Sequence, residues 1–167
     1  MEDKLYCLSC GEKELASQNG HRYACASCEF QIYHNVASTV SLILKVGDEI
    51  LFAKRARDPS KGMLDFPGGF VDPGESLEEA LLREMSEELG WKPMRCEYLF
   101  SFPNTYFYAD VLYNTADAFF LCELSVKPKI KANDDVASLI WIGLEEVPVA
   151  QLGFESMRRA VSKLASI

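Results

Sequence analysis

The sequence predicts an α/β domain in which a mixed sheet lies between helices, preceded by a small domain that a metal ion holds together. From Val36 onward, aliphatic strand segments alternate with amphipathic helix patterns. Residues 1–34, in contrast, contain four of the six cysteines, both histidines and few aliphatic side chains. We therefore expect two domains, residues 1–34 and residues 35–167.

The first part of the larger domain is expected to be a hairpin followed by a loop. Residues 37–46 are rich in Val, Ile and Leu and predict a mostly buried strand. Gly47-Asp48 predicts a turn, and residues 50–54 predict the returning strand. Residues 57–65 predict a loop, and residues 66–70 a tight bend that contains two glycines.

Residues 76–89 predict the strongest helix of the chain. Ser76 and Glu79 have the spacing of a capping box, and Gly90 stands where a C-terminal cap would lie. A second amphipathic helix is expected at the end of the chain, over residues 154–165. Further strands are expected at residues 98–102, 118–126 and 139–142.

Composition and charge limit the partners of the chain. The net charge is −8 and the pI is about 4.8, which argues against a large nucleic-acid surface. No apolar run reaches the roughly 20 residues that span a bilayer, and the N-terminus lacks a signal-peptide core. We expect a cytoplasmic protein with no nucleic acid and no membrane as partner. A phosphorylated small molecule remains possible as substrate, because metal ions bridge carboxylates to phosphates.

Two Cys-x-x-Cys pairs near the N-terminus predict a structural zinc site. Residues 11–24 separate the pairs, slightly fewer than the roughly 15–20 residues usual for this pattern. Four thiolates close a tetrahedral shell and leave no position for substrate water, so the site is expected to be a zinc ribbon. The alternatives are a metal-free remnant or a redox pair, and His21 and His34 are interpreted as surface or hinge residues. The expected ligands are Cys7, Cys10, Cys25 and Cys28.

Three glutamates gather on one side of the predicted helix 76–89. At about 100° per residue, Glu87 lies about 60° to one side of Glu84 and Glu88 about 40° to the other, next to the leucine-rich stripe. Like charges at this spacing destabilise a helix, and partial burial raises the cost. A divalent cation would offset that cost. The alternative is a solvated acidic face paired with Lys and Arg.

The residues around these glutamates resemble the Nudix box. Gly69, Glu75 and the segment Arg83-Glu84-Met85-Ser86-Glu87-Glu88-Leu89-Gly90 meet its fixed positions, while Trp91 stands where the family usually has a smaller aliphatic residue. The resemblance covers residues 36–165. It implies the Nudix α/β/α sandwich and a hydrolase that cuts diphosphate linkages with divalent metal.

The resemblance also implies roles for individual residues. Glu84, Glu87, Glu88 and the Gly69 carbonyl would bind Mg²⁺ or Mn²⁺, and Glu84 or Glu87 would also orient or deprotonate the attacking water. Arg83 would orient Glu87, and Glu75 would tie the loop to the helix. The base in this family sometimes lies outside the box, and the candidates for it here are Asp134, Asp135, Glu145 and Glu146.

Substrate contacts are expected from two further segments. Lys54 and Arg55 follow the second strand and would meet phosphates, although solvated surface charge explains them equally well. Phe102 and Tyr106 belong to an aromatic stretch that would stack on a base, and core packing is the alternative for most of it.

A zinc ribbon before a Nudix domain resembles the NADH pyrophosphatase group. That group usually has an S-Q-P-W-P-F-P-x-S array, and this chain has Ser101-Phe102-Pro103-Asn104 in the comparable region. We therefore expect a more general substrate, a nucleoside diphosphate linked to another group, such as a dinucleotide or an ADP-ribose-like compound. A homodimer is an option for the assembly.

The competing hypothesis is a binding protein. In it, a catalytically retired Nudix fold with a zinc ribbon would sense a nucleotide or regulate through nucleic acid. Loss of a box carboxylate would favour this reading, and none is lost. Acids also outnumber Lys and Arg within residues 1–34, so the sequence favours the enzyme.

Overall fold

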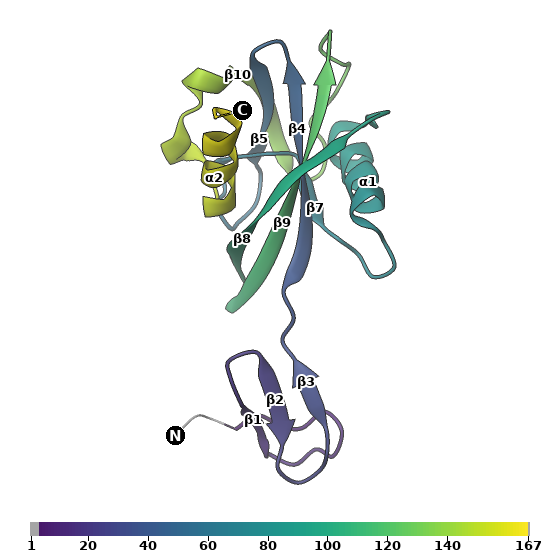
Figure 1. The fold of residues 1–167 in the computed structure, drawn as a ribbon, viewed down its shortest axis with the longest axis vertical. Coiled ribbons are helices and arrows are strands. Elements are labelled where there is room, and N and C mark those ends of the chain that lie inside the picture. Colours follow the sequence, from purple (N-terminus) through teal and green to yellow (C-terminus); the bar gives the residue numbers. More distant parts are fainter. Residues whose placement is uncertain (1–3, 167) are drawn as a thin grey trace. The chain divides into compact units, whose positions relative to one another are not determined.

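The computed structural model describes residues 4–166. The chain forms two compact units, Met1–Val36 and Ala37–Ile167 (Figure 1). Each unit has its own sheet. None of the helices within the described residues is long and apolar enough to cross a membrane.

The small unit is a three-stranded antiparallel sheet with a very small core. Its strands are β1 (Leu15–Ser17), β2 (Arg22–Cys25) and β3 (Gln31–Tyr33), in the order β1-β2-β3. Its buried side chains are Cys7, Leu15 and Cys25, with Tyr23, Cys28 and Phe30 packed against them. A core of this size contributes little stability, so a fold this small usually depends on a metal or on disulfides.

The large unit is built on a mixed seven-stranded sheet. Its main path runs β10-β5-β4-β9-β8, and the pairing of β4 with β9 is parallel while the other pairs are antiparallel. Two short strands attach to it, β6 (Leu64–Asp65) to β5 and β7 (Gly68–Phe70) to β4. The five long strands are β4 (Ala37–Val46), β5 (Glu49–Arg55), β8 (Glu97–Tyr108), β9 (Val111–Leu124) and β10 (Val136–Gly143).

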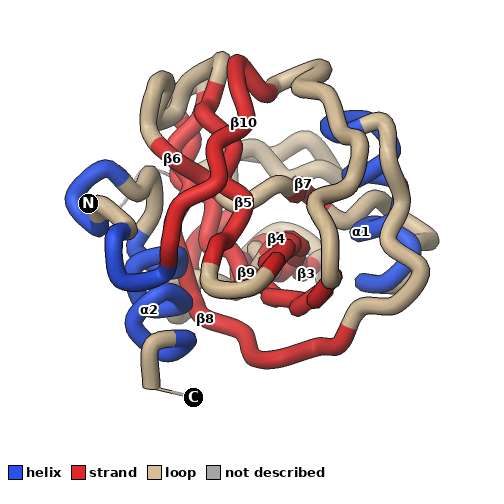
Figure 2. Tube along the Cα trace, turned by 90° about the horizontal axis from the view of Figure 1, so that it is seen from above, coloured by secondary structure: helices blue, strands red, loops and turns tan. Residues whose placement is uncertain are grey.

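Helices cover both faces of this sheet. Helix α1 (Leu77–Leu89) lies on one face and α2 (Glu155–Leu164) on the other, as two perpendicular views show (Figures 1 and 2). The alternation of β4 explains the two layers: Leu42 and Leu44 pack with the α1 core, while Ile43 packs with the α2 core. Short 3₁₀ helices, Leu144–Glu146 and Val149–Gln151, lead into α2. The predicted α/β/α sandwich is confirmed.

The hairpin of β8 and β9 is longer than the sequence predicted. Strands were expected at residues 98–102 and 118–126, yet pairing continues to Tyr108 and Val111. The two-residue turn between them, Ala109-Asp110, has φ of 49° and 62° at its two positions. Turns of this kind usually contain Asn or Gly, so the Ala-Asp pair carries no clear turn signal. Residues 66–70 also differ from the prediction, because their last three residues form β7.

Candidate active site and metal centre

A cavity of about 300 Å³ opens between α1, the β6–β7 segment and the β8–β9 hairpin. The three box carboxylates Glu84, Glu87 and Glu88 line one part of it, and aromatic side chains line another. The remaining residues that line it come from several parts of the chain: Thr39, Val40, Ser41, Arg55, Asp65, Phe66, Gly68, Gly69, Phe70, Asp72, Arg83, Asn104, Tyr106, Thr115, Asp117, Asp134, Asp135 and Phe154.

Helix α1, which carries the carboxylates, begins and ends as predicted. The Glu79 N–H donates to Ser76 Oγ at 3.2 Å, and the Ser76 N–H donates to Glu79 Oε2 at 2.9 Å, so the capping box is formed. Gly90 ends the helix in the left-handed conformation, with φ of 61°. The local signals therefore fix the position of the glutamates along the helix.

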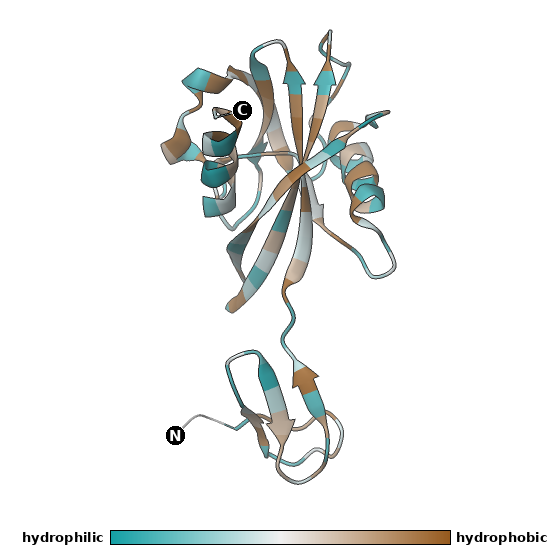
Figure 3. Cartoon of the chain, in the orientation of Figure 1, coloured by the Kyte–Doolittle hydropathy of each residue, from teal (hydrophilic) through white to brown (hydrophobic). Residues whose placement is uncertain are grey.

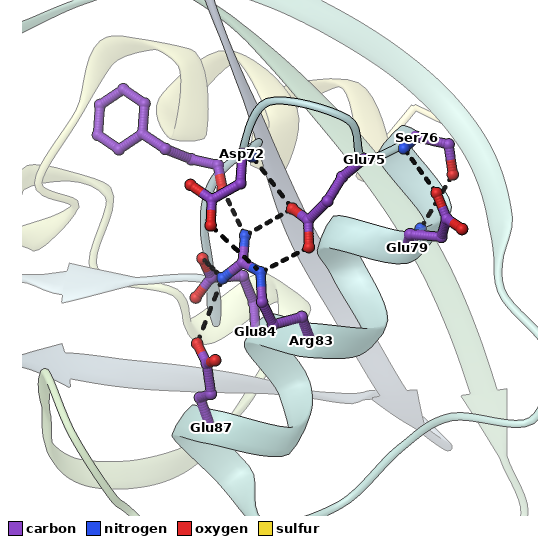
Figure 4. Close-up of polar contacts among 8 residues, drawn as sticks. Asp72, Glu75, Ser76, Glu79, Arg83, Glu84 and Glu87 are labelled. Atoms are coloured by element: carbon purple, nitrogen blue, oxygen red, sulfur yellow. Dashed lines mark hydrogen bonds and ion pairs between the residues drawn. The ribbon is translucent and has the colours of Figure 1, made fainter.

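Arg83 is the centre of an ionic network beside the cavity (Figure 4). Its Nε and Nη2 donate to the two Glu75 oxygens at 2.7 and 2.9 Å, and Nη2 also donates to the Phe70 carbonyl at 2.9 Å. Its Nη1 contacts Glu84 at 2.7 Å and Glu87 at 3.2 Å. Hydrogen bonding to Glu75 raises the pKa of Arg83. The guanidinium thus joins the loop to the helix and orients two of the three carboxylates.

Glu88 is the most buried of the three carboxylates. It is 8% exposed, and its Oε2 accepts a hydrogen bond from the Gly68 N–H at 2.9 Å. Burial, helped by the nearby charge of Glu84 and opposed by the Gly68 hydrogen bond, raises the pKa of Glu88 to about 9. Burial also raises the pKa of Glu84, against the effect of Arg83, while the Glu87 side chain is 48% exposed. The alternative of a solvated acidic face therefore does not hold for Glu88, whose carboxylate is buried.

Two glycines allow the backbone of β7 to approach this helix and the sheet. A Cβ on Gly69 would lie 2.3 Å from Glu84 Oε1, and a Cβ on Gly68 would lie 2.0 Å from the Val40 carbonyl oxygen. Gly68 also has φ of 153°, which disfavours other residues. Gly68 requires glycine because a Cβ there would meet the backbone of β4, whereas a Cβ at Gly69 would displace the Glu84 carboxylate.

Arg55 and three aromatic rings line the cavity away from the carboxylates. Phe70 packs edge-on against Tyr106 at 5.3 Å between ring centroids, and Tyr106 stacks on Phe154 at 5.7 Å. The Arg55 guanidinium lies 5.0 Å from the Phe154 ring and forms an ion pair with Asp65 at 2.7 Å. Arg55 therefore lines the cavity, as a phosphate contact would require, and is not the solvated surface charge of the alternative interpretation, but Asp65 already pairs with its guanidinium.

Asp117 is a buried carboxylate that the sequence analysis missed. Its Oδ1 accepts hydrogen bonds from Thr39 Oγ1 at 2.7 Å and Thr115 Oγ1 at 2.6 Å, and its Oδ2 accepts one from Ser156 Oγ at 2.6 Å. These contacts tie β4 and β9 to the first turn of α2. An acid inside the apolar run of a central strand was the available signal, because such a group must find partners when buried.

Only some of the other predicted site residues line the cavity. Tyr106, Asp134 and Asp135 line the cavity, and Asp135 forms an ion pair with Arg57 at 2.9 Å. Lys54 is exposed and does not line it. Phe102 lies outside it as well, with its ring packed against the α2 core. Two outside base candidates, Glu145 and Glu146, lie in the 3₁₀ helix that follows β10 and do not reach the cavity.

The four cysteines of the small unit converge on one point. All four sulfurs lie within 4.8 Å of one another, with Cys7 Sγ to Cys28 Sγ and Cys10 Sγ to Cys25 Sγ both at 3.7 Å. A zinc ion with bonds of about 2.3 Å to four sulfurs requires sulfurs about 3.8 Å apart. Hydrogen bonds from the Cys10 and Ser9 amides lower the pKa of Cys7 to about 7, whereas the neighbouring thiols raise the pKa of Cys10 and Cys28, so without a metal the four cysteines do not all become thiolates together.

Comparison with known proteins places this chain in one family. The family model described as NUDIX domain matches residues 34–164. The chain is 30% identical over 156 residues to an ADP-ribose pyrophosphatase of Methanocaldococcus jannaschii, covering 89% of both chains. It is 32% identical over 106 residues to the NAD-capped RNA hydrolase NudC of Haemophilus influenzae, covering 60% of this chain and 40% of that protein.

Solved structures agree on the fold. The NUDIX domain of Shewanella oneidensis NrtR, solved with ADP ribose, superposes with a TM-score of 0.66 at 22% identity, covering 81% of this chain and 91% of that one. The match of the family model over most of the chain, together with the relative that aligns along nearly its whole length, shows that this protein belongs to the Nudix hydrolase family.

Proposed function

We propose that this protein hydrolyses the diphosphate linkage of a nucleoside diphosphate joined to another group, such as a dinucleotide or an ADP-ribose-like compound, with Mg²⁺ or Mn²⁺ as cofactor. The observation that carries this proposal is the composition of one cavity. It combines three carboxylates of α1, one of them buried, with a wall of aromatic rings. The carboxylates would bind the metal that a diphosphate needs, and the aromatic rings offer faces on which a nucleoside base can stack.

The carboxylate oxygens of this cluster are the ligands that a hard divalent cation prefers, although within residues 4–166 only the four cysteines already lie close enough together to form a metal-binding group. Glu88 is buried without a cationic partner within hydrogen-bond reach, since its contact is the Gly68 amide. Such a group is costly as an anion unless a cation joins it. Glu84, Glu87, Glu88 and the Gly69 carbonyl would hold the metal. The metal would screen the diphosphate, lower the pKa of a bound water and stabilise the leaving phosphate.

Residues of the chain orient the carboxylates and offer candidates for the base that accepts the proton of the attacking water. Arg83 fixes Glu84 and Glu87, and the Arg83–Glu75 pair fixes the loop that carries Gly69. Glu84 and Glu87 are the candidates within the box for the base that takes the proton of the attacking water. Asp134 and Asp135 are the candidates outside it, because they line the same cavity.

The relatives support the substrate class. An ADP-ribose pyrophosphatase aligns with this chain over 89% of both, and NudC relatives act on NAD-capped RNA. These substrates share an adenosine diphosphate joined to a second group. Phe70, Tyr106 and Phe154 offer ring faces to the base or to the second group.

The cysteine cluster is proposed to bind one structural zinc ion. The sulfur spacing fits a tetrahedral site, and four cysteine ligands leave no open coordination position. The metal would contribute folding energy to a unit whose buried core is Leu15 with the cysteines.

A substrate screen tests the proposed function. NADH, ADP-ribose, diadenosine polyphosphates, nucleotide sugars and oxidised deoxynucleoside triphosphates are incubated with Mg²⁺ or Mn²⁺, and products are quantified by chromatography. We expect cleavage of ADP-containing diphosphates that depends on the metal. Tight binding of one of these compounds without turnover under either metal would favour the competing binding protein.

A further inference from the structure

Asp117 of β9 is a buried acid that the proposed metal chemistry does not use. Its side chain is 7% exposed and lines the active-site cavity. It lies on the face of the sheet that α2 covers, because its Oδ2 accepts a hydrogen bond from Ser156 of α2 and Phe119, two residues further along β9, packs in the α2 core. In Figure 3 the central strands of the sheet are largely hydrophobic, so a carboxylate in one of them needs hydrogen-bond partners.

The hydroxyl groups around Asp117 leave one of its acceptor positions free. A carboxylate accepts about four hydrogen bonds, two at each oxygen. Thr39 and Thr115 occupy both positions of Oδ1, whereas Ser156 occupies one position of Oδ2. Within residues 4–166, no nitrogen of Lys, Arg or His lies within 4.0 Å of the Asp117 oxygens. Because Asp117 lines the cavity, a ligand there is in a position to supply the fourth donor.

Aromatic rings lie on the same face of the sheet as Asp117. Asn104 of β8 lies opposite Thr115, two residues before Asp117, and Tyr106 follows Asn104 by two residues, so these side chains share one face. Tyr106 stacks on Phe154, and Asn104, Tyr106 and Phe154 all line the cavity. The cavity thus combines ring faces with hydrogen-bonding groups on this side of the sheet, the two kinds of contact that hold a planar base.

A single free acceptor position favours a base that presents one N–H donor beside an acceptor. Adenine does so, through its exocyclic amine and the ring nitrogen next to it, to which the Asn104 amide would donate. Guanine presents two adjacent donors that would need both oxygens of one carboxylate, and Thr39 and Thr115 already occupy Oδ1. Hypoxanthine has a carbonyl in place of the amine, which would bring two acceptors together at Asp117.

We propose that Asp117 recognises the exocyclic amine of adenine, and that the base of the substrate, rather than its second group, therefore occupies the side of the cavity lined by Tyr106 and Phe154. The diphosphate would lie at the α1 carboxylates, which line another part of the same cavity. This inference rests on the proposed function and adds a specificity-determining residue and an orientation of the substrate to it.

The experiment changes the base and the second group of the substrate separately. Values of kcat/KM are measured for ADP-ribose, for the same compound with hypoxanthine in place of adenine, and for ADP-glucose. The test variant is Asp117→Asn, which is nearly isosteric and faces hydroxyl groups that can each donate or accept. The matched control is Ser156→Ala, which removes one donor from Oδ2 but keeps the carboxylate.

We expect the wild type to prefer adenine over hypoxanthine by at least about tenfold, because the hypoxanthine carbonyl leaves the Asp117 acceptor unpaired. An amide can turn either its oxygen or its nitrogen to the cavity, so in Asp117→Asn the two bases should differ by less than about threefold. Ser156→Ala should keep the wild-type preference. The ratio of ADP-ribose to ADP-glucose cleavage should be the same in all three proteins, since the second group lies away from Asp117.

Three results would overturn the proposal. The first is a wild type that cleaves the adenine and hypoxanthine compounds equally well, and the second is an Asp117→Asn variant that keeps the wild-type preference. The third is an equal loss of preference in Asp117→Asn and Ser156→Ala, which is the result expected if Asp117 only holds β9 to α2.

A binding measurement keeps this test independent of catalysis. The affinities of AMP and IMP are measured by isothermal titration calorimetry with the wild type and both variants. Tighter binding of AMP that Asp117→Asn abolishes and Ser156→Ala retains supports the role of Asp117 even if no diphosphate is cleaved, in which case only the proposed function fails. Equal affinities in the wild type contradict the role of Asp117 whether or not the variant folds, while cleavage of ADP-ribose would leave the proposed function standing.

Discussion

The Gly68 amide donates a hydrogen bond to the buried Glu88 carboxylate at 2.9 Å, which joins the last turn of α1 to the start of β7. The bond favours the charged form of Glu88, yet burial outweighs it and raises the pKa to about 9. A carboxyl group of this kind is protonated at neutral pH unless a cation binds. Binding of a divalent metal therefore requires release of that proton.

This pKa predicts how stability depends on pH without Mg²⁺ or Mn²⁺. Between the ordinary pKa of about 4.5 and the folded value of about 9, the folded state binds a proton that the unfolded state has released. The free energy of unfolding should therefore fall as pH rises through this window. Glu88→Gln should remove most of that dependence. The free energy of unfolding is measured at each pH by urea unfolding, followed by the fluorescence of Trp91 and Trp141, both in the large unit. If it changes with pH in the same way in the wild type and in Glu88→Gln, the prediction is wrong.

The close approach at Gly69 predicts a severe effect of a single methyl group. Gly69→Ala would bring Cβ within 2.3 to 2.8 Å of all three atoms of the Glu84 carboxylate group. We expect turnover to fall at least tenfold because Glu84 must move. Gly74→Ser is the control, since its Cβ would meet nothing within 4 Å although its φ of 93° adds strain. Steady-state kinetics of both variants on the best substrate from the screen tests this prediction. Equal activity of Gly69→Ala and Gly74→Ser would show that activity does not depend on the close approach of Gly69 to Glu84.

The sulfur geometry predicts about one zinc ion per chain. Protein purified without added zinc should retain it, and Cys25→Ser should loosen residues 4–34 while leaving α1 folded. Elemental analysis and hydrogen exchange measure these two outcomes. Less than about a tenth of an equivalent of zinc, together with four titratable thiols in the small unit, would defeat the assignment.

The absence of the full NADH-type array predicts broad specificity. NADH should not be uniquely preferred over other ADP-containing diphosphates, because Phe102-Pro103-Asn104 replaces part of that array. Values of kcat/KM for NADH, ADP-ribose and diadenosine compounds test this. A preference for NADH above about 100-fold, roughly 2.7 kcal/mol, would show that the departure has no effect on specificity.

The parts of the site that depend on local sequence were predictable. Capping by Ser76 and Gly90 and the helical spacing of the glutamates determine α1 without knowledge of the rest of the fold. Helical spacing also placed the cluster beside the apolar stripe, and the burial of Glu88 agrees with that position.

The parts that depend on tertiary contacts were not predictable. Asp65 and Asp117 reach the cavity only because the sheet brings β4, β6 and β9 together, so the acid within the apolar run of β9 could be noticed in the sequence but not assigned to the site. The aromatic wall requires Phe154, at the start of α2, to meet Tyr106 on β8. Arg55 was expected either to meet phosphates or to be a solvated surface charge, and its ion pair with Asp65, ten residues later, could not be predicted because it depends on the pairing of β5 with β6.

The measurement that tests the central claim most directly is the metal-dependent activity of Glu88→Gln. Gln keeps the size and an acceptor for the Gly68 amide, but it removes the charge on which metal binding depends. Glu79→Gln is the control, because it lies on the same helix, is exposed and does not line the cavity. With saturating Mg²⁺ and the best screened substrate, we predict a loss of at least about 10²-fold in Glu88→Gln and near wild-type turnover in Glu79→Gln. Equal activity of the two variants would contradict the assignment of this cluster as the catalytic metal site.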